Sequence, residues 1–234
     1  MPTKHPHLVN NEIYHIVIRG VADSLLFKDE SDYYRGIFSI YEFNNTKPVE
    51  IRERRKQRKI EKASGGMSSD NRDLLVEILA FCFMPNHIHL LLKQLKDDGI
   101  SRFMQKVGTG YVSYFNKKYR RMGHLFQARF GAIHIKTEEQ FKNVFVYIHT
   151  NPISLVAPEW KEKGIGNSKK VIEFLGNYRW SSYLDYIGKK NFPSIIDKEL
   201  LNKILGSEKG CQKFVENWIL YKAEIKRLGS VILE

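Results

Sequence analysis

Apolar and β-branched residues concentrate in four short stretches that predict strands. Residues 12–20 are rich in isoleucine and valine and end at glycine, which is typical of a strand. Residues 74–83 form a near-continuous apolar run, as in a strand buried on both faces. A tight turn containing Pro85 and Asn86 follows, so residues 87–93 are predicted to return antiparallel. Residues 131–136 supply the fourth predicted strand.

Helical spacing of apolar residues predicts helices between and after these strands. The first spans residues 29–43, and the second is a long helix that begins at Asp97-Asp98. The third begins at Thr137, a capping residue, and stops at Asn151 because a proline follows. The order β-α-β-β-α-β-α predicts an α+β fold, a ferredoxin-like antiparallel sheet with helices on one face.

Residues 44–73 interrupt this pattern with a basic insertion. Residues 47–62 hold eight basic and three acidic side chains, and residues 64–70 are rich in glycine and serine. We interpret the segment as a solvated, partly disordered insertion in preference to a specific binding arm. An arm of this charge would nevertheless reach phosphate groups well.

The chain is long enough for one sizeable core and an appendage. We predict a domain at residues 1–190, which includes the insertion, and a C-terminal helical extension at 191–234. The pattern of the extension gives no indication of its role.

Charge and cysteine content narrow the functional classes. The formal net charge is +12 and the sequence pI about 9.5, which favours a polyanionic partner. The sequence has no apolar run of membrane-spanning length, no signal-peptide pattern at its N-terminus and no lipidation motif. Its two cysteines are far apart and lack metal-site spacing. We therefore expect the partner to be nucleic acid, with no membrane involved. The expected location of the protein is the cytoplasm, in association with the nucleoid.

Two histidines on the predicted third strand are the first candidates for chemistry. His87 and His89 are two residues apart, so both side chains project from the same face. Two imidazoles on a rigid strand can hold a divalent metal, although an isolated His-x-His is more often an ordinary surface pair. The motif Tyr147-Ile148-His149-Thr150-Asn151-Pro152 changes this assessment. Tyr147 lies on the flank of its helix's apolar stripe and shares a ridge with Asn143 and Asn151.

Together, these residues suggest separate roles in metal binding and in nucleophilic attack. His87, His89 and the side-chain oxygen of Asn151 can hold one cation and leave positions open for phosphate oxygens. Such mixed ligation suits Mn²⁺ or a loosely held Mg²⁺, with Zn²⁺ as an alternative. A cation there would polarise a phosphodiester, and Tyr147 could attack the phosphorus. A phenol needs a nearby cation or base for this, since it is mostly protonated at neutral pH.

The paired motifs resemble those of the HUH single-tyrosine transposases, and within them most closely the REP-associated tyrosine transposases. Residues 84–92, Met-Pro-Asn-His-Ile-His-Leu-Leu-Leu, and residues 147–152 carry the resemblance. Stretches at 14–20, 114–119, 123–130 and 180–183 support it, and it covers about residues 8–188.

The resemblance implies a transposase that is a single-strand endonuclease and transesterase. Such enzymes cut single-stranded DNA near hairpin-forming repeats, form a 5′-phosphotyrosine, free a 3′-hydroxyl and rejoin strands with Mg²⁺ or Mn²⁺. Tyr147 matches the nucleophile, His87 and His89 match the metal ligands, and Asn151 stands where the family places a third, amide-bearing ligand. The basic insertion and the tail after about residue 190 depart from the pattern, which leaves target choice and the choice between monomer and homodimer open.

Other side chains have weaker claims to a role in the site. We expect His149 at the surface or beside the ligands, and we interpret His15 as an ordinary sheet residue. Aromatic residues at helical spacing are expected in the core. The candidate DNA contacts are basic side chains at strand ends, at the end of the long helix and in the insertion. They are Arg19, Lys117, Lys118, Arg120, Arg121, Arg129, Arg54, Arg55, Lys56 and Arg58.

Three functions remain open from the residues alone. The first is strand transfer through Tyr147. The second is a metal-dependent phosphodiesterase in which the histidines activate water and Tyr147 only positions substrate. The third is a domesticated protein that binds hairpin DNA without cutting it.

Overall fold

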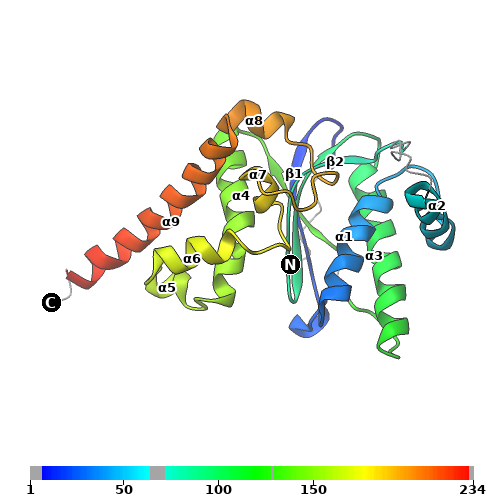
Figure 1. Cartoon of the computed structure of the whole chain (residues 1–234), viewed down its shortest axis with the longest axis horizontal. Coiled ribbons are helices and arrows are strands. Elements are labelled where there is room, and N and C mark those ends of the chain that lie inside the picture. The colour runs from blue at the N-terminus through cyan, green and yellow to red at the C-terminus, as the bar shows by residue number, and fades with distance from the viewer. Residues whose placement is uncertain (1–6, 64–71, 128, 232–234) are drawn as a thin grey trace.

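A four-stranded antiparallel sheet forms the centre of the molecule (Figure 1). The computed structural model describes residues 7–63, 72–127 and 129–231. The strands are β1 (Ile13–Arg19), β2 (Val76–Met84), β3 (His87–Gln94) and β4 (Gly131–Ile135), in the order β2-β3-β1-β4. All four strands predicted from the sequence are confirmed, as is the α+β class.

The register between β1 and β3 decides which side chains share a face. Arg19 pairs with His87 and Val17 pairs with His89, so these four side chains project to the same side. Ile18 and its alternate neighbours along β1 project to the other side. The sheet therefore has an apolar face and a face that carries the two histidines.

Two helices cover the apolar face. They are α1 (Glu30–Glu42) and α3 (Gly99–Lys118), and Figure 1 shows them side by side on one side of the sheet. Asp29 caps α1, because its carboxylate accepts from the amide of Asp32 and the Asp32 side chain binds back to residue 29. A single-turn 3-10 helix, η1 (Val21–Asp23), connects β1 to the segment that precedes α1.

The prediction that the helices lie on one face of the sheet holds only for α1 and α3. Helix α4 (Glu138–Thr150) packs against β2 and β3 from the opposite face, so the sheet lies between two helical layers. The physical reason lies in β2, whose side chains are buried on both faces from Ile78 to Met84. A strand of this composition needs apolar cover on each side, and α4 provides the second cover.

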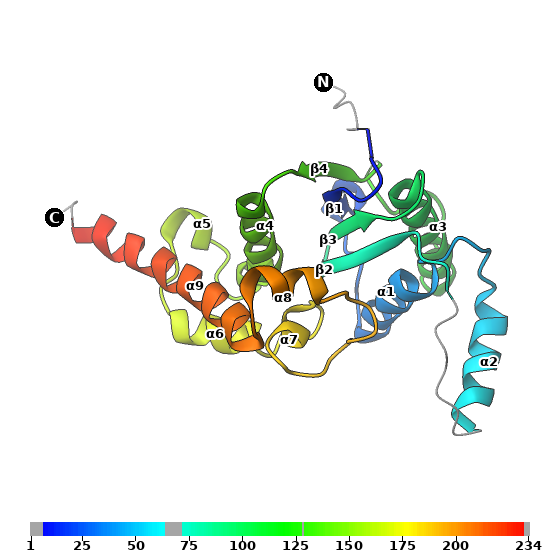
Figure 2. The ribbon, with the colours of Figure 1, turned by 90° about the horizontal axis from the view of Figure 1, so that it is seen from above.

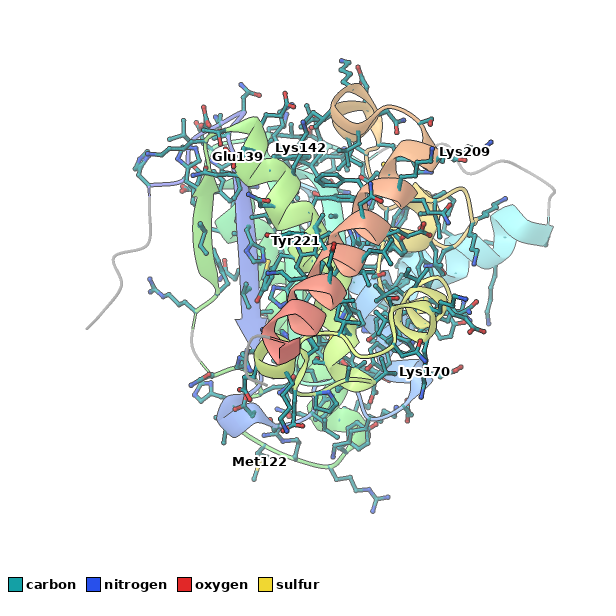
Figure 3. All side chains as sticks on the ribbon, turned by 90° about the vertical axis from the view of Figure 1, so that its left-hand side faces the viewer. Met122, Glu139, Lys142, Lys170, Lys209 and Tyr221 are labelled. Atoms are coloured by element: carbon teal, nitrogen blue, oxygen red, sulfur yellow. The ribbon has the colours of Figure 1, made fainter. Side chains whose placement is uncertain are left out.

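The C-terminal segment continues this second layer. It contains η2 (Asn151–Leu155) and α5 (Trp160–Lys163), then α6 (Ser168–Leu175), α7 (Tyr183–Tyr186), α8 (Glu199–Leu205) and α9 (Glu208–Val231). Helix α9 contacts α4, α6, α7 and α8, and it runs across the front of the view in Figure 3. Its buried residues Cys211, Val215 and Ile219 join the same apolar core as the sheet. The predicted helical extension is therefore packed on the helix that carries Tyr147.

The outer edge of β2 is covered by residues 178–186. The amide of Phe83 donates to the carbonyl of Trp180 (2.8 Å), and the amide of Ser182 donates to the carbonyl of Phe81 (3.0 Å). The Tyr186 hydroxyl donates to the carbonyl of Leu79. At the other edge of the sheet is β4, where Ile133 is 60% exposed.

The basic insertion contains a helix that the sequence analysis did not predict. Helix α2 (Ile51–Ala63) stands away from the sheet, beyond α1 and α3 (Figure 2). Its base is attached by an ion pair between Arg54 Nε and Glu42 Oε2 (2.9 Å), in which the Glu42 side chain is buried. The tether expected at 64–70 lies outside the described residues.

Gly108 and Gly110, in the middle of α3, differ in the space around them. A Cβ at Gly110 would lie 2.3 Å from the Phe43 ring, whereas one at Gly108 would meet only Phe126, at 3.8 Å. We expect Gly110→Ala to destabilise the fold by about 1–2 kcal/mol through overpacking. Gly108→Ala should stabilise it by up to about 1 kcal/mol, because alanine is the better helix former. Thermal denaturation of both variants tests this, and shifts of the same sign would contradict it.

No helix in the described part of the chain is long and apolar enough to cross a membrane.

Candidate active site

The histidine-bearing face of the sheet meets α4 at the site proposed from the sequence. The rings of His87 and His89 lie 4.8 Å apart between centroids and are nearly perpendicular. His89 is only 2% exposed, while His87 is half-buried. The turn at Pro85 and Asn86 begins β3 at His87, so the strand carries both imidazoles at its first positions.

His89 is oriented by a neighbour on β1. His15 Nε2 lies 3.0 Å from His89 Nδ1, and the two rings are stacked. His89 Nε2 is buried and has no hydrogen-bond partner among the described residues. When Nδ1–H donates to His15, the lone pair of His89 Nε2 is left available to a ligand. The sequence analysis interpreted His15 as an ordinary sheet residue, but the structure places it within hydrogen-bond distance of His89.

His87 is held in a similar way. Its Nδ1 donates to Asn86 Oδ1 at 2.6 Å, since an amide oxygen only accepts. Asn151 also hydrogen-bonds to His87. The Asn151 amide nitrogen donates to the carbonyl of Tyr147 (2.9 Å), and its side-chain oxygen is left available to a cation. Asn151 is buried at the junction of α4 and η2.

Tyr147 faces this group from α4 and remains accessible. Its side chain is 39% exposed, and its ring is edge-on to His89 (5.4 Å) and to His15 (5.8 Å). The prediction that Tyr147 lies on the flank of the helix is confirmed, because the neighbouring Ile148 is fully buried. An exposed phenol above two imidazoles is therefore open to a bound strand.

Burial and positive charge keep the imidazoles neutral. Burial lowers the pKa of His87 to about 4 and that of His89 to about 2, and Arg19 and Lys161 act in the same direction. Burial also lowers the pKa of His15 to about 4. Neutral imidazoles are the form that binds metal, so these side chains need not lose protons at neutral pH.

Two cations flank the site. Arg19, which the sequence analysis proposed as a phosphate contact, ends β1 beside His87 and pairs with Asp23 at 2.9 Å. Lys161 on α5 lies 5.8 Å from the centroid of the Tyr147 ring. The sequence analysis missed Lys161, since nothing in the local pattern of residues 158–165 connects it to the tyrosine. Both cations favour a phosphodiester at this position.

The donor atoms fit a divalent cation with partial protein ligation. The described residues contain no cluster of three or more His, Cys, Asp or Glu side chains suited to a metal. The available donors are the two imidazoles and the amide oxygen of Asn151. The unpartnered, buried Nε2 of His89 is the feature that indicates a ligand here. A set of three neutral donors leaves the cation its full charge and open positions.

Other proposed DNA contacts are already engaged within the fold. Lys118 Nζ pairs with Asp29 and with Asp32, each at 2.7 Å. Arg54 anchors α2 through Glu42. These two cations therefore stabilise the protein and are not free to bind phosphate.

The remaining candidates do not converge on the histidines. Lys56, which is exposed, lies on α2, on the far side of α1 and α3 from α4 (Figure 2). The side chains of Arg55 and Arg58 lie outside the described part of the structure. Exposed cations at and beyond the end of α3 are Lys117, Arg120 and Arg129, and Arg121 donates to the carbonyl of His124.

His149 is a core residue and not a surface residue. Its side chain is fully buried, its Nε2 lies 2.8 Å from Ser182 Oγ, and it packs on Phe145 and Tyr186. The expectation of a surface position was wrong because α7 and α9 cover this side of α4.

Comparisons with known proteins bear on this arrangement. The family model described as "Transposase IS200 like" matches residues 50–151, which include β2, β3, α3, β4 and α4. A solved structure described as "Structure of the REP associates tyrosine transposase bound to a REP hairpin" has the same fold with a TM-score of 0.51. It is 14% identical, and the match covers 84% of this chain and 92% of that one. No curated protein matches the chain.

Residues 50–151 thus resemble the IS200-like transposases, and the chain shares the fold of a solved tyrosine transposase. Residues 50–151 carry the pattern of the IS200-like transposase family, and the resemblance expected from the sequence is confirmed.

Proposed function

We propose that this protein cuts and rejoins single-stranded DNA through Tyr147 during DNA transposition. One observation carries the proposal. An exposed tyrosine stands edge-on over a buried pair of neutral histidines, one helical turn before an amide that reaches the same pair. This is the geometry required for attack on a phosphodiester that is held against the histidines.

His87, His89 and Asn151 are the residues that would hold a divalent ion. Mg²⁺ or Mn²⁺ bound there would polarise the phosphodiester and neutralise charge in the transition state. His15 would keep His89 in the metal-binding tautomer, and Arg19 and Lys161 would attract the phosphate.

The proposed step forms one bond and breaks one. Tyr147 Oη, having lost its proton to solvent, attacks the phosphorus and forms a 5′-phosphotyrosine. The bond from phosphorus to the 3′-oxygen breaks, and that oxygen takes a proton to become a free 3′-hydroxyl. Attack by a 3′-hydroxyl on the phosphotyrosine reverses the step and joins strands. The covalent link conserves the energy of the broken bond, and simple hydrolysis would lose it.

We infer that the substrate is a single strand with hairpin or repeat structure. The similar solved protein is described as bound to a REP hairpin. The net charge of +12 supports a DNA partner, and the exposed Tyr147 is accessible to an unpaired strand. We expect either a monomer or a homodimer.

We expect Tyr147→Phe to abolish covalent attachment to DNA. The phenol oxygen is the only atom removed, and the exposed ring keeps its contacts, so the fold should be unchanged. Labelled single-stranded hairpin DNA with Mn²⁺ should give a denaturation-resistant adduct with wild type, and at least about a thousandfold less with the variant. The exposed Tyr221→Phe on α9 is the matched control.

The same assay separates the alternatives. Cleavage that survives in Tyr147→Phe would contradict the proposal in favour of a phosphodiesterase that activates water. Binding without cleavage by either protein would identify a domesticated hairpin-binding protein.

A further inference from the structure

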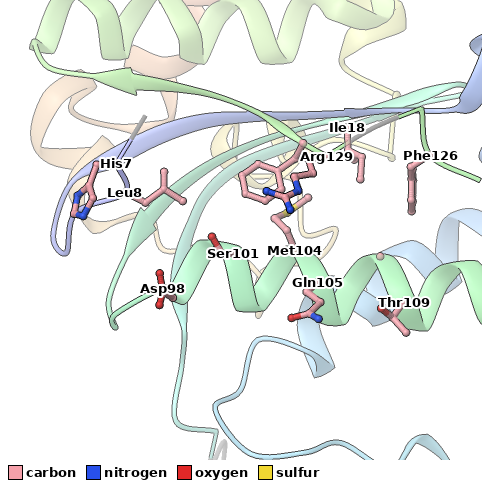
Figure 4. A pocket seen from close by; sticks show the side chains of 12 residues that line it. His7, Leu8, Ile18, Asp98, Ser101, Met104, Gln105, Thr109, Phe126 and Arg129 are labelled. Atoms are coloured by element: carbon pink, nitrogen blue, oxygen red, sulfur yellow. The ribbon is translucent and has the colours of Figure 1, made fainter. Parts of the chain in front are cut away.

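A deep groove lies on the opposite face of the sheet from Tyr147. It has a volume of about 720 Å³ and runs between α3, the end of β1 and the loop before β4 (Figure 4). Its floor is apolar and includes Ile18 and Met104, while Phe126 and Phe130 form its wall. A groove of this size is ample for a nucleotide.

Polar side chains line the α3 side of the groove at regular intervals. Ser101, Gln105 and Thr109 are spaced i, i+4 and i+8, so they form one stripe that Figure 4 shows along the helix. An amide side chain offers a donor and an acceptor together, which matches the edge of a nucleobase. The hydroxyls on either side extend this hydrogen-bonding edge.

Gly108 keeps the groove open. A Cβ there would have room and would contact only Phe126, so packing does not require a glycine. A larger side chain at this position would instead enter the groove. The neighbouring Gly110, by contrast, is needed to fit against Phe43.

Charged side chains are unevenly distributed along the groove. Arg129 is exposed and lies near the middle of the groove, between Leu8 and Ile18, whereas Asp98 lies at one end with His7 (Figure 4). A phosphate group is therefore favoured near Arg129 and disfavoured near Asp98. Aromatic walls, a hydrogen-bonding stripe and one cation together match the base and the phosphate of a nucleotide.

We propose that this groove binds an unpaired nucleotide of the DNA strand that Tyr147 attacks. Ile18 projects into the groove, and the next residue, Arg19, projects beside His87 on the opposite face. The wall is fixed to the same strand end, because the Gln127 amide donates to the Arg19 carbonyl (2.9 Å) and Phe126 bridges to Gly20. A strand that crosses the end of β1 therefore connects the two sites. The identity of the strand rests on the proposed function, but base binding does not.

Photocrosslinking tests the proposal without knowledge of the target sequence. The probe is oligothymidylate carrying one 5-iododeoxyuridine, which crosslinks to an aromatic ring on which it stacks. The full-length protein is irradiated with the probe, and mass spectrometry locates the modified residue. We expect the crosslink on Phe126 or Phe130. A crosslink confined to other residues would overturn the proposal.

Filling the groove gives the second measurement. Gly108→Leu should reduce the crosslink yield at least about fivefold, since stacking on one base contributes that much or more. Ser113→Leu is the matched control, because Ser113 is an exposed position on α3 outside this groove, and its yield should equal that of wild type. Equal yields from Gly108→Leu and wild type would overturn the proposal, and circular dichroism verifies that both variants are folded.

A free nucleotide has the same chemistry as a nucleotide within a strand, so it is the competing ligand for the groove. Thymidine 5′-monophosphate at the concentration of the probe should leave the crosslink unchanged if the groove takes a nucleotide within a strand, and complete competition would overturn that assignment. Repeating the crosslink in Tyr147→Phe separates this test from the proposed function. A crosslink in Tyr147→Phe, combined with no covalent adduct in wild type, supports the groove and contradicts strand transfer. A covalent adduct in wild type without the crosslink contradicts the groove alone.

Discussion

Replacing His89 with glutamine is expected to abolish both metal binding and covalent attachment to DNA. The substitution keeps most of the side-chain volume but places no imidazole Nε2 in the buried position opposite Tyr147. We expect adduct formation to fall by about a hundredfold or more. We also expect Mn²⁺ to raise the melting temperature of the wild-type protein and not that of the variant, since a ligand stabilises only the state that binds it.

Two further histidine variants calibrate this result. His15→Ala removes the partner that orients His89 and should cost about ten- to a hundredfold in activity or metal affinity. His134→Ala removes a histidine from β4 that pairs with Glu12, and it should leave the response to Mn²⁺ unchanged.

Thermal denaturation without metal shows whether each variant is folded, and metal titration then reports on the site alone. An unchanged Mn²⁺-dependent stabilisation in a folded His89→Gln protein would rule out His89 as a ligand.

Replacing Asp32 with alanine is expected to cause the largest loss of stability, about 3–5 kcal/mol of unfolding free energy. Its carboxylate is fully buried and accepts from Lys118 (2.7 Å), from the Tyr119 hydroxyl (2.7 Å) and from the Tyr114 hydroxyl (3.0 Å). Alanine would remove this shared acceptor where α1 meets the end of α3, and Lys118 would keep its pairing with the exposed Asp29. Chemical denaturation measures the loss.

The neighbouring Asp29 provides the matched control. It also pairs with Lys118 at 2.7 Å, but its side chain is 52% exposed. An exposed pair contributes little, so Asp29→Asn, which can retain the capping interaction, should cost at most about 1 kcal/mol. Equal losses from the two substitutions would show that burial of Asp32 is not the determining factor.

The same carboxylate makes stability depend on pH. Burial opposes ionisation of Asp32, but hydrogen bonds from Lys118 and Tyr119 outweigh it, so its pKa is lowered on folding. Ionisation therefore stabilises the fold above the unfolded-state pKa of about 3.9, and this contribution is lost as the pH falls through the folded value. Unfolding free energy measured from pH 5 downward should decline more steeply in wild type than in Asp32→Asn.

The strands and helices of the core could be predicted from the sequence because their signals are local. The β-branched residues of β1, the apolar run in β2 and the Thr137 cap of α4 each depend on neighbours within a few residues. The continuous apolar run of β2 also implied a second covering layer. Hydrophobic periodicity does not show which helix forms that layer, so α4 could not be assigned to it from the sequence.

The site could be predicted only in part for a related reason. His87 and His89 are recognisable by their spacing on a strand, and Tyr147 by its position on a helix flank. His15 and Lys161 join them through tertiary packing, from β1 and α5, with no spacing rule to connect them. The role of His149 was misjudged because helices later in the chain bury it.

The basic insertion was misjudged because composition outweighed periodicity. Seven of the thirteen residues of α2 are lysine or arginine, which is typical of solvated and disordered segments. Lysine and arginine are nevertheless good helix formers. The Arg54–Glu42 pair, which joins positions twelve residues apart, attaches the helix to the core and lies outside the range of any local pattern.

The segment at residues 178–186 has a consequence for self-association. An exposed strand edge is a template on which another chain can add a strand, and the backbone groups of β2 that would serve this purpose are already bonded to Trp180 and Ser182. Growth of the sheet from one molecule into the next is therefore directed to the β4 edge, where Ile133 is exposed. A dimer built by continuous strand pairing would place two β4 strands against each other. The two β2 edges would then lie at the ends of the shared sheet, each covered by residues 178–186.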